Sequence, residues 1–205
     1  MLVKVFGAAV QGISATIISI EVNISRGIKF FLVGLPDNAI KESHERIVSA
    51  LQYNGIKFPG QQIVINMAPA DIKKEGAAYD LPLAIGILAA NGNISKEKAE
   101  QYLIMGELSL DGTLKPIKGV LPIAIKAREE GFKGFILPKE NSREAAVVNN
   151  LDVYGVSNIT EVIDFLNDKI ELEKTEVNPR EEFFAHINAF DIDFSDVRGQ
   201  ENVKR

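Results

Sequence analysis

The stretch that decides the fold runs from Gln62 to Ala90 and reads QIVINMAPADIKKEGAAYDLPLAIGILAA. Its opening segment, Ile63 to Met67, is mostly apolar and rich in β-branched residues, which predicts a buried strand. A polar loop follows over residues 69–76. Residues 77–90 are small and aliphatic with apolar side chains at helical spacing, which predicts a closely packed helix. Strand, Gly-containing loop and helix in this order often build a site at the helix N-terminus.

The loop carries the charged run Lys73-Lys74-Glu75 and a single glycine, Gly76. A joint of this kind is most often only a joint, in which case the charged run is an exposed, solvated turn. The alternative is a functional loop in which Lys73 and Lys74 contact DNA or a partner. The residues alone leave both interpretations open.

Three strands and a helix are expected before this stretch. The strands fall at residues 1–10, 15–24 and 28–33, and we expect them to form an antiparallel meander. Asp37 is a good N-cap for a helix that ends at Gly55. His44 lies on or beside the apolar face of that helix, so we expect a packed or partly exposed residue without a catalytic role.

A hairpin and alternating strands and helices are expected after the stretch. Asp111-Gly112 is a strong hairpin turn signal, and the strand before it is expected to run continuously over residues 102–110. Further helices are expected at 120–130, 140–148 and 159–167, and strands at 135–137 and 153–156. This order predicts an α+β fold that merges into α/β, with one mixed sheet and helices packed on it.

The composition indicates a soluble globular protein, with 46% hydrophobic and 25% charged residues. Cysteine is absent and the two histidines, His44 and His186, lie far apart, so neither a disulfide, a thiol nucleophile nor a metal site is expected. The start of the chain has no signal-peptide pattern, and no apolar run approaches the roughly 18 residues of a membrane span. We therefore expect a cytoplasmic protein with no membrane contact.

The net charge of −5 is unevenly distributed. Residues 161–205 hold 12 acidic and 6 basic residues, whereas residues 1–160 hold 16 acidic and 17 basic residues. The acidity therefore belongs to the tail, and the nearly neutral body shows no strongly basic face for DNA. Residues 171–190 are polar and acidic and include Pro179, so we expect them to be mobile or extended.

Three long segments carry a family resemblance. They read VGLPDNAIKESHERIVSALQYNG, PADIKKEGAAYDLPLAIGILAA and GELSLDGTLKPIKGVLP. In this order they resemble the N-terminal domain of the ComM/YifB family, also called Mg chelatase-like or ChlI-related proteins, which are bacterial AAA+ ATPases. The resemblance covers essentially the whole chain. It implies the ribosomal S5 domain 2-like fold, which the protease domain of Lon and the C-terminal domain of RadA share.

The resemblance also implies a division of the chain into three segments. Residues 1–168 are expected to form the Lon-like domain and residues 169–189 an acidic linker. Residues 190–205 contain FSDVRGQENVKR, which resembles the lead-in to an AAA+ ATPase module, and we expect the chain to stop inside that module. No Gly-x-x-x-x-Gly-Lys-Ser/Thr run is present, so ATP and magnesium are expected in the missing module and no cofactor in these residues.

Lon-type proteases use a serine nucleophile just after an acid–Gly pair and a lysine base shortly after a Pro-Ile-Gly-Gly run. In this chain the acid–Gly pair is Glu75-Gly76, and the serine position falls on Ala78. The second run is PIKG, residues 116–119, and the lysine position falls on Leu121. Both catalytic groups are replaced by apolar side chains, so the resemblance implies no protease activity. Lys118 lies nearby but belongs to the loop, and we do not assign it as a base.

The family resemblance implies a hexameric, ATP-driven motor that acts on single- or double-stranded DNA in recombination, including branch migration in natural transformation. This domain would then serve assembly, DNA contact or coupling to its own AAA+ module, with Lys73 and Lys74 as the candidate contact loop. One alternative is a small-molecule phosphotransferase of S5-like fold, although the loop offers one glycine and no serine for phosphate. The other is an accessory domain of a magnesium chelatase-type ATPase, for which we see no carboxylate cluster.

Overall fold

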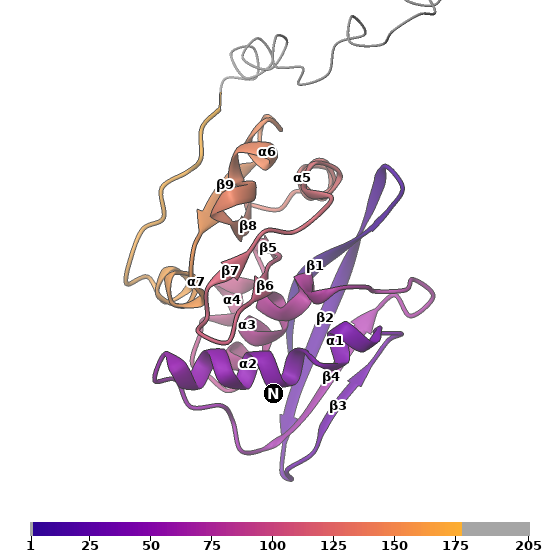
Figure 1. Ribbon diagram of the computed structural model, residues 1–205, viewed down its shortest axis with the longest axis vertical. Coiled ribbons are helices and arrows are strands. Elements are labelled where there is room, and N and C mark those ends of the chain that lie inside the picture. The colour runs from indigo at the N-terminus through magenta and orange to yellow at the C-terminus, as the bar shows by residue number, and fades with distance from the viewer. Residues whose placement is uncertain (1, 178–205) are drawn as a thin grey trace, which may run out of the picture.

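A seven-stranded mixed sheet forms the centre of the computed structural model, which describes residues 2–177 (Figure 1). Its strand order is β3-β4-β2-β1-β5-β8-β9. The strands are β1 (Leu2–Gln11), β2 (Ser14–Ser25), β3 (Phe30–Val33), β4 (Gln62–Ala68), β5 (Tyr102–Ile104), β8 (Gly134–Pro138) and β9 (Asp152–Val156). β1, β2 and β4 are antiparallel neighbours, and the other pairs are parallel. The predicted mixed sheet is therefore present.

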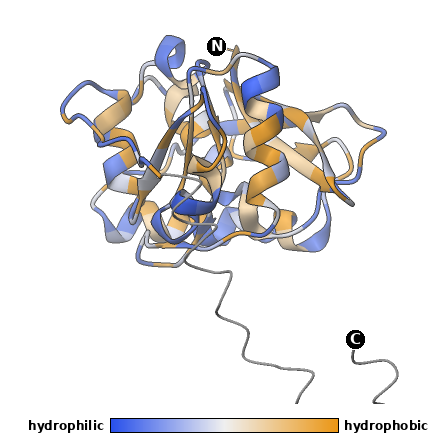
Figure 2. Cartoon of the chain, turned by 90° about the horizontal axis from the view of Figure 1, so that it is seen from above, coloured by the Kyte–Doolittle hydropathy of each residue, from blue (hydrophilic) through white to orange (hydrophobic). Residues whose placement is uncertain are grey.

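Helices pack against this sheet, as the sequence predicts. The α-helices are α1 (Asn38–Lys41), α2 (Ser43–Tyr53), α3 (Asp80–Ala90), α4 (Lys96–Ala99), α5 (Val120–Glu129), α6 (Ser142–Ala146) and α7 (Ile159–Leu166), and the 3-10 helices are η1 (Ala77–Tyr79) and η2 (Lys139–Asn141). Figure 2 shows hydrophobic residues concentrated on the inner sides of helices and strands. No helix within residues 2–177 has the length and apolar character needed to cross a membrane.

The predicted strand and helix of the opening stretch are confirmed. β4 buries its side chains alternately, as a strand with one covered face does. All eleven residues of α3 are buried. At Gly86, an added Cβ would lie 2.8 Å from the Val22 side chain and 3.1 Å from the Val5 side chain. The missing side chain thus lets α3 approach β1 and β2 closely, as the many small residues indicated.

The predicted antiparallel meander is wrong in its third strand. β4 lies between β2 and β3, and β3 pairs in parallel with β4. β4 pairs with β2 over the seven residues of its length, whereas β3 has only four residues. The longer apolar strand takes the position beside β2, and the short strand is left at the edge of the sheet.

The predicted strand over residues 102–110 is interrupted. The chain leaves the large sheet after Met105, because Gly106 N–H donates to Ala78 O at 2.8 Å instead of continuing the strand ladder. The predicted hairpin turn at Asp111-Gly112 then joins two short strands, β6 (Glu107–Leu108) and β7 (Leu114–Lys115), in a separate sheet.

The remaining helices follow the predictions with local changes. Asp37 is the N-cap, and its carboxylate accepts the Ile40 N–H at 2.9 Å, but the helix is divided at Glu42 into α1 and α2. The expected helix at 140–148 is a 3-10 turn followed by the short α6. α5 and α7 lie where they were expected, and Asn158 caps α7 in a capping box.

The chain stays in contact with the domain beyond α7. Thr175 N–H donates to Val153 O at 2.8 Å, Lys174 pairs with Asp152 at 2.9 Å, and Leu172 packs on the core. Lys174 and Thr175, inside the expected linker, therefore contact the β9 edge of the sheet. Residues 178–189 of that linker and the expected module start at 190–205 lie outside the described residues, so these domain boundaries stay predictions.

Candidate binding cleft

A cleft of about 220 Å³ opens where β1 loses its neighbour β5. The two strands pair only at Phe6 and Leu103. Further along β1, Ala8 N–H donates to Met105 Sδ at 3.3 Å, and Ala8 O accepts the Tyr79 hydroxyl at 2.9 Å. The lining residues are Ala8, Ala9, Val10, Lys73, Glu75, Ala78, Tyr79, Met105, Lys118 and Ile123. The cleft thus joins four segments that are distant in the sequence: the end of β1, the loop before η1 together with η1, Met105 after β5, and the start of α5 with the loop before it.

Ala78, the position of the Lon-type serine, lies in this cleft. Among residues 2–177, no Ser, Thr, Cys or His side chain lines the cleft, so this part of the chain gives it none of the usual neutral nucleophiles and no imidazole base. Leu121, the position of the Lon-type lysine, does not line the cleft and is 39% exposed on α5. The structure therefore brings only one of the two replaced positions into the cleft.

Lys118 is a cleft residue to which sequence reasoning gave no role. It lies in the loop before α5, next to Gly119, whose φ is +73°. A Cβ on Gly119 would lie 2.9 Å from the Val10 side chain, so the glycine lets this loop rest directly on β1. The Pro-Ile-x-Gly run was the available signal, because its glycine indicates a close approach of the backbone.

The charges around the cleft do not balance. Lys73 forms an ion pair with Glu75, and both side chains are largely exposed. Within residues 2–177, Lys118 has neither an ion pair nor a side-chain hydrogen bond. Lys118 is therefore the charged lining side chain that has no partner in the described part of the chain, and its ammonium favours a small anion over a neutral group at that end of the cleft.

Lys74 is not part of an exposed charged run, and that prediction is wrong. Its side chain is fully buried beneath the loop, and its ammonium donates to Gly34 O at 2.8 Å and to Pro69 O. Burial lowers the pKa of Lys74, and nearby Asp71 opposes that shift. Two carbonyl oxygens that would otherwise lack a donor explain why a lysine is held inside. Lys73 is exposed, as predicted.

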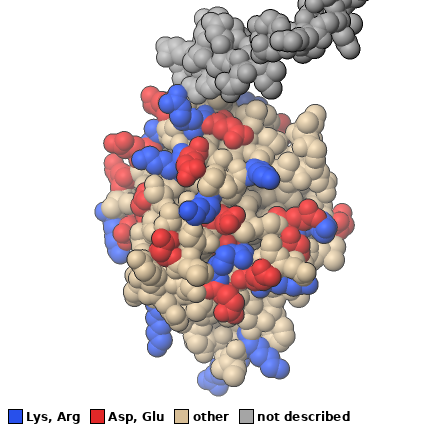
Figure 3. All heavy atoms as spheres, in the orientation of Figure 1, with Lys and Arg blue, Asp and Glu red and all other residues tan. Residues whose placement is uncertain are grey.

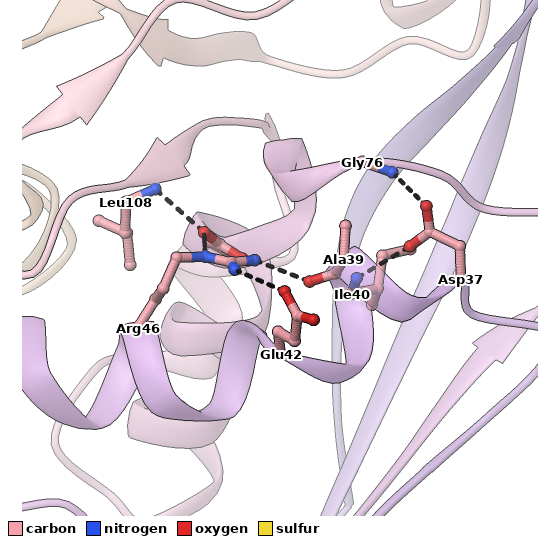
Figure 4. A network of polar contacts seen from close by, with 8 residues as sticks. Asp37, Ala39, Ile40, Glu42, Arg46, Gly76 and Leu108 are labelled. Atoms are coloured by element: carbon pink, nitrogen blue, oxygen red, sulfur yellow. Dashed lines mark hydrogen bonds and ion pairs between the residues drawn. The ribbon is translucent and has the colours of Figure 1, made fainter.

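Asp37 ties the start of η1 to α1 (Figure 4). One carboxylate oxygen accepts the Ile40 N–H, and the other accepts the Gly76 N–H at 2.9 Å. The Gly76 amide is one that a phosphate at this helix start would use. In this chain a side chain already occupies it.

Asp80 lies fully buried in the first turn of α3, where Arg46 of α2 holds it. Arg46 Nε and Nη2 donate to the two carboxylate oxygens at 2.7 and 2.9 Å, and Leu108 N–H adds a third bond at 3.2 Å. Arg46 Nη2 also donates to Ala39 O at 2.8 Å (Figure 4). Burial raises the pKa of Asp80, while Arg46 and the Leu108 amide favour its ionised form. This network joins α1, α2, α3 and β6.

Neither the histidine nor the acidic residues form a metal site in the described part of the chain. His44 packs between Phe30 and Phe58, with ring centroids 4.6 and 5.3 Å away, which confirms the prediction of a packed helix residue. No group of three or more His, Asp or Glu side chains within residues 2–177 is arranged to hold a metal ion. His186 lies outside those residues.

The charged side chains are mixed in sign over the face shown in Figure 3. Blue and red groups alternate, and no continuous basic area is present on that face. This agrees with the nearly neutral body of the sequence. A DNA contact on this face would therefore rest on single lysines.

The sheet order and the cleft together define a mixed-sheet domain whose cleft is lined, among the described residues, by no serine, threonine or cysteine. The profile of the family described as subunit ChlI of Mg-chelatase matches residues 20–141, and the chain belongs to this family. Among curated relatives, it is 37% identical to competence protein ComM of Haemophilus influenzae over 98% of this chain and 40% of the relative. It is 38% identical to the uncharacterized protein YifB of Escherichia coli over 96% of this chain and 38% of the relative.

A weaker likeness reaches the Lon proteases. Lon protease 2 of Bacillus subtilis is 32% identical over 60% of this chain and 22% of the relative. This likeness and the mixed sheet with packed helices support the predicted ribosomal S5 domain 2-like fold. The predicted family is confirmed. The chain spans about two fifths of the length of the ComM and YifB relatives.

We expect Lys74→Met to lower the free energy of unfolding by about 1–3 kcal/mol, because it leaves the Gly34 and Pro69 carbonyls without a donor. Lys73→Met is the matched control and should leave the unfolding curve unchanged, since its ammonium is in solvent. Urea unfolding of the two variants and the parent chain measures both effects. Equal effects of the two substitutions would show that Lys74 has no structural role.

Proposed function

We propose that this chain is a non-catalytic, Lon-like domain of a larger ComM/YifB-type ATPase, and that its cleft binds a partner without cleaving it. The observation that carries this proposal is the lining of the cleft. Ala78 occupies the serine position, and none of the other lining side chains is a serine, threonine, cysteine or histidine. A hydroxyl nucleophile and its base are both required for Lon-type hydrolysis, so the loss of both leaves only binding.

The whole protein, in this proposal, is an ATP-driven hexameric motor that acts on DNA. Support comes from the family and from the relative named as a competence protein. ATP and magnesium would bind outside these 205 residues, which contain no Gly-x-x-x-x-Gly-Lys-Ser/Thr run. This domain would serve assembly, DNA contact or coupling to the motor, in the cytoplasm.

Two other functions fit the described residues less well. A phosphotransferase would use backbone amides at the helix start, but Asp37 occupies the Gly76 amide and the loop has a single glycine. An accessory role in magnesium insertion has the family description in its favour. However, residues 2–177 contain no cluster of carboxylates or histidines that could hold the magnesium ion.

We expect no hydrolysis of casein or fluorogenic peptides by this chain at micromolar concentration, because Ala78 replaces the serine nucleophile and no serine, threonine or cysteine is found among the described residues that line the cleft. A Lon protease assayed in parallel verifies the substrates. Turnover that follows the protein through successive columns would contradict the proposal.

We expect Lys73→Ala in the full-length protein to weaken DNA binding and to reduce its salt dependence, because each lost phosphate contact lowers the slope by about one unit. Several loops acting together in a hexamer would strengthen a weak single contact. The 205-residue chain alone should bind no more tightly than the non-specific range of roughly 10⁻⁴–10⁻⁶ M.

The measurement is a titration with labelled single- and double-stranded DNA at several salt concentrations. Lys57→Ala is the control. Lys57 is an exposed lysine before the start of β4, whereas the loop that holds Lys73 follows the end of β4, at the opposite end of the strand. Superimposable curves for Lys73→Ala and the parent would assign Lys73 to an ordinary solvated turn.

A further inference from the structure

Val10 presents unpaired backbone groups to the cleft. Ala8, two residues earlier, directs its N–H and C=O away from β2, toward Met105 and Tyr79. Backbone groups in a strand repeat their direction every second residue, so those of Val10 point the same way. Within residues 2–177, β1 has no strand neighbour on that side beyond Phe6. In the same residues, the N–H and C=O of Val10, which face the cleft, have no hydrogen-bond partner.

One part of the lining is apolar, and the cleft is small. Ala8, Ala9, Ala78, Met105 and Ile123 contribute only methyl, thioether and aliphatic surface. The volume of about 220 Å³ is below the range of roughly 300–1,000 Å³ that is typical of drug-sized ligands. Such a cavity accepts one compact apolar side chain.

The charge at the cleft selects a monoanion. Lys118 is uncompensated, whereas Lys73 is neutralised by Glu75. One unpaired ammonium balances the charge of a monoanion, whereas a phosphate dianion would keep a negative charge in excess. A single carboxylate matches one free ammonium.

We propose that this cleft binds the carboxy-terminal residue of a polypeptide chain. The terminal carboxylate contacts Lys118, a small apolar side chain enters the cavity, and the backbone of the bound residue pairs with Val10. A chain terminus supplies all three features within one residue, as in other sites that capture terminal carboxylates. This proposal rests on the proposed non-catalytic function, because a bound peptide must remain intact.

The test is a titration of the ¹⁵N-labelled chain, followed by heteronuclear NMR, with acetyl-Ala-Ala-Leu bearing either a free carboxylate or a terminal amide. The free acid should shift the amide signals of Val10 and Ala78, and the terminal amide should bind at least tenfold more weakly. Lys118→Ala should weaken binding of the free-acid peptide by a similar factor. Lys115→Ala is the matched control, an exposed lysine three residues away that does not line the cleft, and should have no effect.

Three outcomes would overturn the proposal. The first is equal signal shifts with the free-acid peptide and the amidated peptide, and the second is a Lys118→Ala variant that binds the free acid as tightly as the parent chain. The third is an affinity for sodium acetate equal to that for the free-acid peptide, which would indicate a carboxylate site that does not recognise peptide. Cleavage of the peptide during the titration gives new signals and contradicts the non-catalytic function instead. Failure of binding and failure of the proposed function are therefore distinguishable.

Discussion

The buried ion pair between Arg46 and Asp80 is the interaction on which the arrangement of the cleft depends. Asp80 is fully buried and would be strongly destabilising without a partner. The two-pronged contact with Arg46 and the Leu108 amide satisfies it, and Arg46 reaches on to Ala39. One carboxylate thereby fixes the first turn of α3 relative to α1, α2 and β6, and Ala78 in the cleft lies two residues before it.

The loop in front of α3 is held by two further internal contacts. Lys74 binds the carbonyls of Gly34 and Pro69, and Asp37 binds the Gly76 amide. The Lys74 ammonium and the Gly76 amide, which could bind phosphate on an open loop, are thus used inside the domain, and Lys73 stays exposed. The free functional groups that remain at the cleft are the Lys118 ammonium and the backbone edge of Val10, and these suit a peptide ligand better than a nucleotide.

Local sequence patterns predicted the helices and strands well. The order of the strands and the surroundings of single lysines depend on contacts between residues that are distant in the sequence. The strand at 63–67, the Asp37 cap and the hairpin turn at 111–112 depend on neighbouring residues, and all three are present. The sheet position of β3 depends on which strand offers β2 the longer pairing, and a local pattern does not contain that comparison. Burial of Lys74 depends on carbonyls 40 and 5 residues away, and the role of Lys118 depends on where Gly119 rests on β1.

The central claim is that the Arg46–Asp80 pair holds the start of α3, and with it the cleft, in place. A double-mutant cycle with Arg46→Met, Asp80→Leu and the double variant, measured by urea unfolding, tests it most directly. Each single change should lower the free energy of unfolding by about 2–4 kcal/mol, since one partner is left buried and uncompensated, and the double variant should recover a large part of that loss. Single effects that simply add in the double variant would contradict the claim.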